Sequence, residues 1–186
     1  MTTPWIPPPE SLNHFPTELC PHPEWWHAWN PVSTEAEVSM LVAAFVKALQ
    51  PEFIIEIGAH YGQTTERIAL VIRENGHGEF ISLEFNPELA GSARARCWEF
   101  VDKQVKIIVA NSLEYIPPKP VDFLFVDGSD QRSLDVEHYL PYLAAHCIVI
   151  VHDTAYYLSE TARILELWKW DHVSFNTPRG LMVLTR

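Results

Sequence analysis

Two glycines at a spacing of four, Gly58 and Gly62, are the first residues of this chain whose placement could do chemistry. They follow the apolar run Phe53–Ile55 and Glu56, and the polar segment Gln63–Glu66 comes after them. This order predicts a buried strand, a tight turn and a helix N-terminus, where bare backbone and free N–H groups can meet an anionic ligand. A nucleotide-like cofactor fits such a turn. The alternative is a plain turn whose glycines only set backbone angles.

Polar residues also stand where the later predicted strands end, and these residues are Glu84, Asn111, Ser112, Asp127, His152 and Asp153. The carboxyl ends of parallel strands meet along one edge of a sheet, which is where ligands bind in folds of this kind. Glu84 stands 22 positions after Gly62. An acidic side chain there is placed to accept hydrogen bonds from both hydroxyls of a ribose. The alternative is a solvated loop carboxylate.

The segments between these residues alternate between helix and strand patterns. Apolar spacing predicts helices over 34–50, 63–74, 87–100, 112–115, 132–143 and 157–170. Apolar runs predict strands over 53–57, 79–83, 105–110, 121–126, 147–151, 172–175 and 181–184. Ser33 or Thr34 is expected to cap the first helix. Five strand–helix units in succession predict an α/β fold with a doubly wound, Rossmann-like sheet, mostly parallel with one antiparallel strand near the C-terminus.

The composition is that of a single globular domain. The chain has 186 residues, of which 47% are hydrophobic, and a formal net charge of −11. The negative charge and the lack of any run of Lys or Arg argue against nucleic acid or an anionic membrane as the main partner. Three widely spaced cysteines do not form a disulfide framework, and no signal peptide or membrane span is visible, so the expected location is cytoplasmic.

Residues 1–33 form an N-terminal arm that differs from the domain expected over 34–186. The arm holds eight of the fifteen prolines and four of the seven tryptophans. Dense proline opposes regular structure, yet the aromatic side chains need cover. We therefore expect the arm to lie across the domain or a neighbouring subunit, as a lid or a homodimer contact. Cys20, His22 and His27 do not have the spacing of a known metal site.

The glycine pattern E-x-G-x-x-x-G, followed by Glu84 at the end of the second strand, resembles the class I S-adenosylmethionine-dependent methyltransferases. The resemblance covers roughly residues 34–186. The segments VDFLFVDGSD, IVIVHDT and RGLMVL are similar to those of the small O-methyltransferases, both the catechol type and the macrolide-sugar type. The resemblance implies a methyl group moved from S-adenosylmethionine (SAM) to an oxygen of a small-molecule acceptor, whose identity the sequence does not give.

The resemblance also implies which residues bind the cofactor. They are Glu56, Gly58 and Gly62 at the methionine end, Glu84 at the ribose, Asn111 and Ser112 beside the adenine, and Asp127 near the methionine amino group and the methyl. His60 lies inside the glycine turn, where we expect it to contact the cofactor or the substrate, or else solvent.

Asp127, His152 and Asp153 are the expected catalytic residues. In the metal-dependent members, aspartates at the places of Asp127 and Asp153 bind Mg²⁺, which would lower the pKa of the acceptor oxygen. His152 is then a candidate general base. Thr154 stands where catechol-type enzymes have asparagine, and it is a poorer ligand, so the metal is left open.

Two alternatives lead to different functions. A SAM-binding scaffold without catalysis would act through its aromatic arm. A nicotinamide-dependent reductase on a similar sheet would need a hydride-transfer Tyr-x-x-x-Lys motif.

Overall fold

The computed structural model describes residues 16–186; Trp5 and the rest of residues 1–15 lie outside the described part. Its strands form one sheet in the order β3-β2-β1-β4-β5-β7-β6. Their bounds are β1 Phe53–Ile57, β2 Glu79–Glu84, β3 Val105–Val109, β4 Val121–Val126, β5 Leu143–His152, β6 His172–Phe175 and β7 Leu181–Thr185. Strand β7 pairs antiparallel with both β5 and β6, whereas the other pairs are parallel. The predicted fold class, with one antiparallel strand near the C-terminus, is confirmed.

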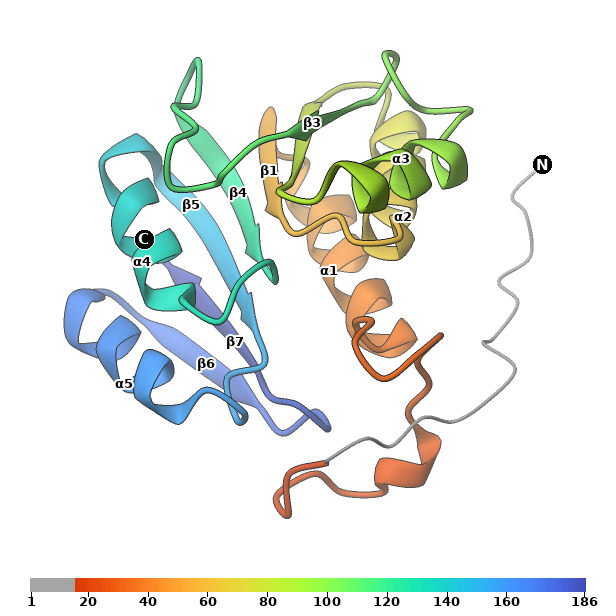
Figure 1. Cartoon of the computed structure of the whole chain (residues 1–186). Coiled ribbons are helices and arrows are strands. Elements are labelled where there is room, and N and C mark those ends of the chain that lie inside the picture. Colours follow the sequence, from red (N-terminus) through yellow and green to blue (C-terminus); the bar gives the residue numbers. More distant parts are fainter. Residues whose placement is uncertain (1–15) are drawn as a thin grey trace.

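Helices cover both faces of this sheet, as Figure 1 shows. They are α1 Ala36–Leu49, α2 Gln63–Asn75, α3 Pro87–Arg96, α4 Arg132–Tyr139 and α5 Leu158–Leu167, with short 3-10 turns η1 Pro23–Trp25 and η2 Leu140–Tyr142. Helices α1 to α3 pack into one hydrophobic cluster, and α4 and α5 pack into the other. Within residues 16–186, no helix is both long enough and apolar enough to cross a bilayer.

Strand β1 shows why both faces must be covered. Its five residues are all buried. Ile54 joins the cluster on the side of α1 to α3, while Phe53 and Ile55 join the opposite cluster. Successive side chains of a strand point to opposite faces, so an entirely buried strand needs a helical layer on each side. This central strand delivers the glycine turn to the carboxyl edge of the sheet.

Several predicted features of local structure were wrong. The helix predicted over 132–143 ends at Tyr139, and Leu143 already belongs to strand β5. Residues 112–114 form a turn and not a helix, because Pro117 and Pro118 leave no room for a second helical turn. Neither Ser33 nor Thr34 caps α1. Glu35 stands at the N-cap position without a side-chain cap, and the Thr34 hydroxyl donates to Asp127 instead. Thr34, which was expected to cap a helix, thus binds Asp127, one of the expected catalytic residues. By contrast, Asn86 caps α3 as its sequence context indicates.

Candidate active site at the carboxyl ends of the strands

Two adjoining cavities lie at the carboxyl edge of the sheet, called here the rim. The first has a volume of about 280 Å³, and its lining includes Gly58, His60, Glu84, Asp127 and Asp153. The second has a volume of about 210 Å³, and its lining includes Gly58, Glu84, Asn111 and Ser112. The two cavities share Gly58 and Glu84. Their linings together contain seven of the residues singled out by sequence, which the sheet topology thus brings to one place.

Gly58 has the backbone geometry that the glycine turn predicts. Its φ is +94°, and a Cβ at this position would lie 2.5 Å from the Cα of Gly128. The turns after β1 and β4 therefore touch through bare backbone. Gly62 also has a positive φ, +79°, but a Cβ there would lie 3.0 Å from the Cα of Ala93. Gly62 lines neither cavity and allows α2 to approach α3.

Glu84 is held by the loops that surround it. Its Oε2 accepts from the backbone N–H of His60 at 2.8 Å, and its Oε1 accepts from that of Asn86 at 2.9 Å. The buried His60 Nδ1 has no hydrogen-bond partner among residues 16–186. Burial lowers the pKa of His60, despite the nearby carboxylates of Glu84 and Asp127. His60 is therefore a neutral imidazole that lines the first cavity.

Asn111 and Ser112 line the second cavity, although their side chains also serve the local turn. Asn111 Oδ1 accepts from the backbone N–H of Leu113 at 3.1 Å. The Ser112 hydroxyl donates to Asp135 at 2.6 Å. These bonds fix the loop after β3 beside Glu84, and each side chain keeps hydrogen-bonding capacity for a ligand.

Glu56 lies behind the rim and lines neither cavity. Its side chain is fully buried, and its Oε2 accepts from the hydroxyls of Thr65 at 2.6 Å and Ser82 at 2.5 Å. Burial outweighs these hydrogen bonds and raises the pKa of Glu56 to about 7. The contact with the cofactor expected for Glu56 thus stays a prediction, and its present bonds join β1 to α2 and β2.

Asp127 is bound on both of its carboxylate oxygens. Oδ1 lies 2.9 Å from His152 Nδ1, and the Thr34 hydroxyl donates to Oδ2. Burial raises the pKa of Asp127, but the positive charges of His152 and Arg132 outweigh it and lower the pKa to about 2. Asp127 is therefore a fixed negative charge at the wall of the first cavity.

His152 is 0% exposed, and both of its ring nitrogens face carboxylates. Nδ1 lies beside Asp127, and Nε2 lies 2.8 Å from Glu35 Oε2. Burial lowers the pKa of His152, yet the surrounding carboxylates of Asp153, Asp127 and Glu35 raise it well above its ordinary value. An imidazolium with both N–H groups engaged has no free nitrogen to accept a proton. The geometry therefore argues against His152 as the general base.

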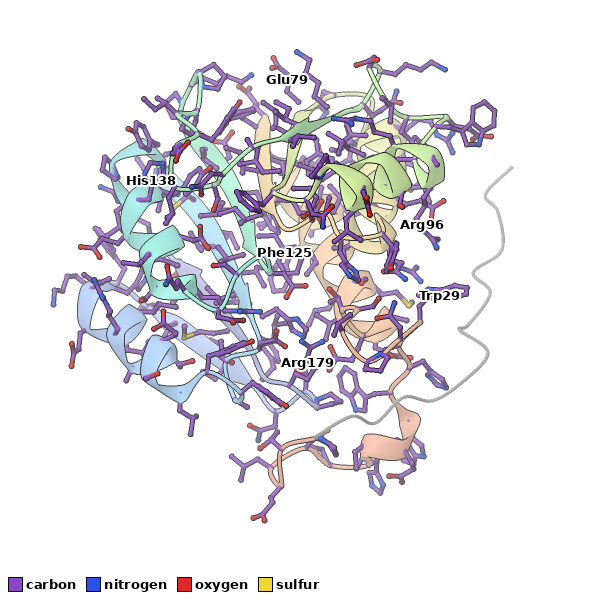
Figure 2. All side chains as sticks on the ribbon, viewed as in Figure 1. Trp29, Glu79, Arg96, Phe125, His138 and Arg179 are labelled. Atoms are coloured by element: carbon purple, nitrogen blue, oxygen red, sulfur yellow. The ribbon has the colours of Figure 1, made fainter. Side chains whose placement is uncertain are left out.

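Asp153 is bound by two arginines. Arg132 Nη2 lies 2.5 Å from Oδ2. Arg179 Nη2 donates to the same oxygen at 2.8 Å, while Arg179 Nε lies 2.6 Å from Oδ1. Burial raises the pKa of Asp153 against the attraction of His152 and the two guanidinium groups. Figure 2 shows Arg179 at the lower end of the sheet, far from Glu79 at the upper end.

Sequence reasoning missed four of the residues that build this cluster, namely Thr34, Glu35, Arg132 and Arg179. Thr34 and Glu35 were interpreted only as parts of a helix start. Arg179 had a topological signal that could have revealed it. Strand β7 runs antiparallel to β5, and His152 pairs with Leu181. The turn before β7 must therefore lie at the carboxyl end of β5, beside Asp153.

The fit of a divalent cation can be judged from these contacts. Asp127, His152 and Asp153 offer ligand atoms that lie within 4.8 Å of one another. Hydrogen bonds with Thr34, Glu35 and the two arginines engage these atoms, except for Asp153 Oδ1, which is in an ion pair with Arg179 Nε at 2.6 Å. Mg²⁺ requires about six oxygen ligands in octahedral geometry, and here it would also face two guanidinium charges. The side chains as placed do not fit such a cation.

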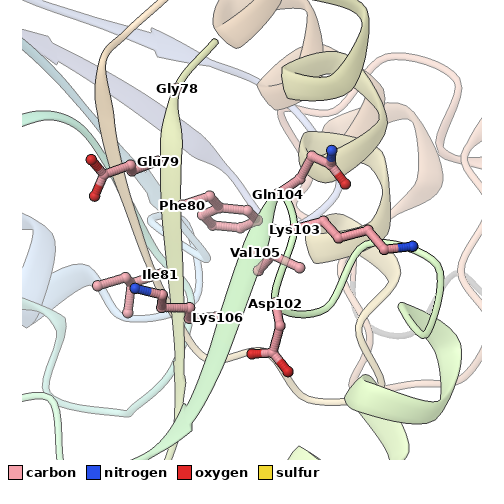
Figure 3. Close-up of a pocket in the computed structure, with 9 residues that line it drawn as sticks. All are labelled: Gly78, Glu79, Phe80, Ile81, Asp102, Lys103, Gln104, Val105 and Lys106. Carbon is pink, nitrogen blue, oxygen red and sulfur yellow. The ribbon is translucent and has the colours of Figure 1, made fainter. Parts of the chain in front are cut away.

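Two other features do not contribute to the rim. Tyr115 and Lys119 have Tyr-x-x-x-Lys spacing, but Pro117 and Pro118 separate them, and Lys119 pairs with Glu79 at 2.8 Å at the amino end of β2. A cavity of about 210 Å³ lies between the starts of β2 and β3, lined by Gly78–Ile81 and Asp102–Lys106 (Figure 3). It is at the opposite end of the sheet from Asp127.

Comparison with known proteins places this geometry among methyltransferases. A model described as the methyltransferase domain matches residues 55–154, more than half of the chain. Over an aligned segment of 134 residues, the chain is 30% identical to catechol O-methyltransferase B of Danio rerio. That segment is 70% of this chain and 46% of that protein. The chain thus spans about half the length of this curated relative.

Solved structures with the same fold include two O-methyltransferases. TomG from Streptomyces achromogenes, in complex with SAM, has a TM-score of 0.69 and 18% identity, with 82% of this chain and 81% of that chain covered. An O-methyltransferase from Bacillus cereus, in complex with SAH, has a TM-score of 0.71 and 17% identity, with 84% of each chain covered. Together with the family match, the sheet order and the glycine turn lead to one conclusion: this chain belongs to the methyltransferase domain family.

Proposed function

We propose that this chain transfers a methyl group from SAM to an oxygen atom of a small-molecule acceptor. The observation that carries the proposal is the pair of adjoining rim cavities that share Gly58 and Glu84. The two solved O-methyltransferases with SAM or SAH have this fold, which supports a cofactor of that kind. Danio rerio catechol O-methyltransferase B supports an oxygen as the acceptor atom.

The rim offers a suitable group for each part of the cofactor. Gly58 leaves the backbone uncovered where the methionine end would approach, and His60 lines the same cavity beside it. Glu84 would accept from the ribose hydroxyls. Asn111 and Ser112 would lie beside the adenine in the second cavity.

The chain's contribution to catalysis would be alignment, water exclusion and a fixed charge. SAM would supply a methyl group on a sulfonium. The acceptor oxygen would displace the thioether in line, and the proton of the acceptor hydroxyl would pass to water. Asp127 places a negative charge at the first cavity, where it would attract the positive end of the cofactor. His152 acts as a positioning residue that holds Asp127 and is not part of the cavity wall. Mg²⁺ on Asp127 and Asp153 forms no part of this mechanism, because both carboxylates are already bound.

The N-terminal arm is proposed as a cover for the acceptor. Val32, near the end of the arm, lines the first cavity together with Thr34, the first residue of the domain. The arm is held down by a hydrogen bond from the Thr17 backbone N–H to the Pro178 carbonyl at 2.7 Å. Trp29 lies under the guanidinium of Arg96 at 5.5 Å, as Figure 2 indicates on the right of the molecule. A homodimer contact through the same arm is the other form of this proposal.

Methyl transfer by the full chain tests the proposal. SAM binding is measured by calorimetry, and a labelled methyl group is then followed from SAM to a panel of phenols and other hydroxylated small molecules. The proposal expects binding and label on an acceptor oxygen, identified by mass spectrometry. Binding without transfer to any acceptor would favour the non-catalytic scaffold. A folded sample that shows no binding would contradict the proposal.

A further inference from the structure

Six ionisable side chains form one closed network at the rim, and they are Glu35, Asp127, Arg132, His152, Asp153 and Arg179. Three of them are carboxylates. The other three are cations, since both ring nitrogens of His152 face carboxylate oxygens and so both must carry hydrogen. The network therefore carries no net charge, and each carboxylate has at least one cation as a direct partner.

The arginines of this network are fixed by further contacts. Arg132 Nε donates to the His152 carbonyl at 2.8 Å, and Arg132 Nη1 donates to the Ser129 carbonyl. Arg179 Nη1 donates to the Ser33 carbonyl at 3.2 Å. The side chain of Arg132 is only 5% exposed. Both guanidinium groups are therefore tied to backbone on one side and to Asp153 on the other, so neither is a loose surface charge that could move aside at little cost.

These contacts occupy the positions a divalent cation would need. Asp153 Oδ2 accepts from both guanidinium groups, and its Oδ1 lies 2.6 Å from Arg179 Nε in an ion pair without hydrogen-bond geometry. Both Asp127 oxygens have partners in His152 and Thr34. A metal would have to displace these partners and would add two positive charges to a balanced cluster. Strong like-charge repulsion from Arg132 and Arg179 would then oppose its binding.

We propose that Arg132 and Arg179 take the place of a divalent cation in this chain, so that methyl transfer proceeds without Mg²⁺ or Mn²⁺. This inference rests on the proposed function.

The lack of a metal also affects which acceptors are favoured. A metal ion with two open coordination positions favours acceptors that carry two adjacent oxygens, because both oxygens can bind to the ion. Two guanidinium groups already bound to Asp153 give no such advantage. The acceptor therefore needs only a single reacting hydroxyl, and a vicinal diol has no advantage over it.

Metal binding tests the inference without any acceptor. Mn²⁺ is titrated into the full chain, with and without SAM, and bound metal is followed by electron paramagnetic resonance and calorimetry. The expected result is no binding tighter than about 1 mM. The variant Arg179→Ala should bind Mn²⁺ at least roughly tenfold more tightly than the wild type, because it releases the Asp153 carboxylate. The matched variant Arg163→Ala removes an exposed arginine paired with Glu137 and should match the wild type.

Tight Mn²⁺ binding by the wild type that is lost in Asp153→Asn would overturn the inference. The wild-type titration decides the matter even where Arg179→Ala does not fold. Turnover of whichever acceptor is methylated should be unchanged by EDTA, and a phenol should react within roughly tenfold of the matching ortho-diol. Turnover that requires added Mg²⁺ would overturn the inference and leave the proposed function intact. Absence of SAM binding would instead remove the proposed function, while the Mn²⁺ result would still stand.

Discussion

Glu35 and His152 are 117 positions apart in the sequence, yet Glu35 Oε2 lies 2.8 Å from His152 Nε2. Both side chains are buried. This contact joins the start of α1 to the end of β5. It thereby also attaches the segment before α1 to the rim. The imidazolium of His152 is thereby held between two carboxylates and, in turn, holds Asp127 at the cavity wall.

Replacing Glu35 should destabilise the fold. In Glu35→Gln the buried imidazolium loses one of its carboxylates, which we expect to cost about 3 kcal/mol of unfolding free energy. Urea unfolding followed by circular dichroism measures this difference. The control Glu137→Gln breaks an exposed pair with Arg163 and should change stability by less than about 0.5 kcal/mol. Equal losses of unfolding free energy in the two variants would show that the Glu35–His152 contact stabilises the fold no more than an exposed ion pair does.

The close approach of the two loops should make Gly58 intolerant of any side chain. In Gly58→Ala a Cβ would lie 2.5 Å from the Gly128 Cα, so we expect a loss of at least about 3 kcal/mol and of SAM binding. Gly76→Ala is the matched control, since Gly76 also has a positive φ but nothing lies within 4 Å of its Cβ position. It should cost only about 1 kcal/mol and leave SAM binding intact. Thermal unfolding and calorimetry distinguish the two, and a mild effect of Gly58→Ala would refute the contact.

Burial of Glu56 should make stability depend on pH. Its pKa is about 7 in the folded chain, against an ordinary value of 4.5. Between these values the folded chain binds more protons than the unfolded chain, so the stabilisation present below the lower value is lost as pH rises through the higher one. Relative to the wild type, Glu56→Gln should therefore gain about 2 to 3 kcal/mol between about pH 5 and pH 8.

Urea unfolding at the two pH values measures that gain. Glu74→Gln, at an exposed ion pair with Lys47, is the control and should follow the wild type at both pH values. If the difference between Glu56→Gln and the wild type is the same at both pH values, the buried carboxyl does not ionise as described.

The ribose role proposed for Glu84 predicts a specific loss of cofactor affinity. Hydrogen bonds to a charged group contribute about 1.5 to 3 kcal/mol, so Glu84→Gln should raise the dissociation constant of SAM roughly 10- to 100-fold. Glu79→Gln is the control on the same strand: Glu79 lies at the opposite end of β2 and pairs with Lys119. Calorimetry with SAM should show no change for that variant. Similar effects from both ends of the strand would indicate that Glu84 does not contact the cofactor.

The strands and their common edge were predictable because periodicity and chain order are local properties. The bounds predicted for the first strand, 53–57, are those of β1. Once parallel strands are expected, Glu84 and Asp127 must lie at one edge. The partners of the charged groups were not predictable in this way, because pairing depends on side chains brought together from distant elements. Glu35 has the sequence context of an ordinary acid in a first helical turn, so nothing local indicates its pairing with His152.

His152 illustrates the limit of reasoning from residue type. An unperturbed imidazole titrates near neutral pH, which made it a natural candidate for a base. In the structure its two nitrogens are engaged by Asp127 and Glu35, and its pKa is raised well above the ordinary value. To predict the protonation state of a histidine, one must know how many carboxylates surround its ring. The folded arrangement determines that number, and a single sequence does not reveal it.

A crystal structure of the full chain grown with S-adenosylhomocysteine tests the central claim most directly. The account predicts ligand density along the rim, from Gly58 past Glu84 to Asn111, with ribose oxygens within hydrogen-bonding distance of the Glu84 carboxylate. An empty rim at saturating ligand, or density in the cavity between the starts of β2 and β3, would contradict it.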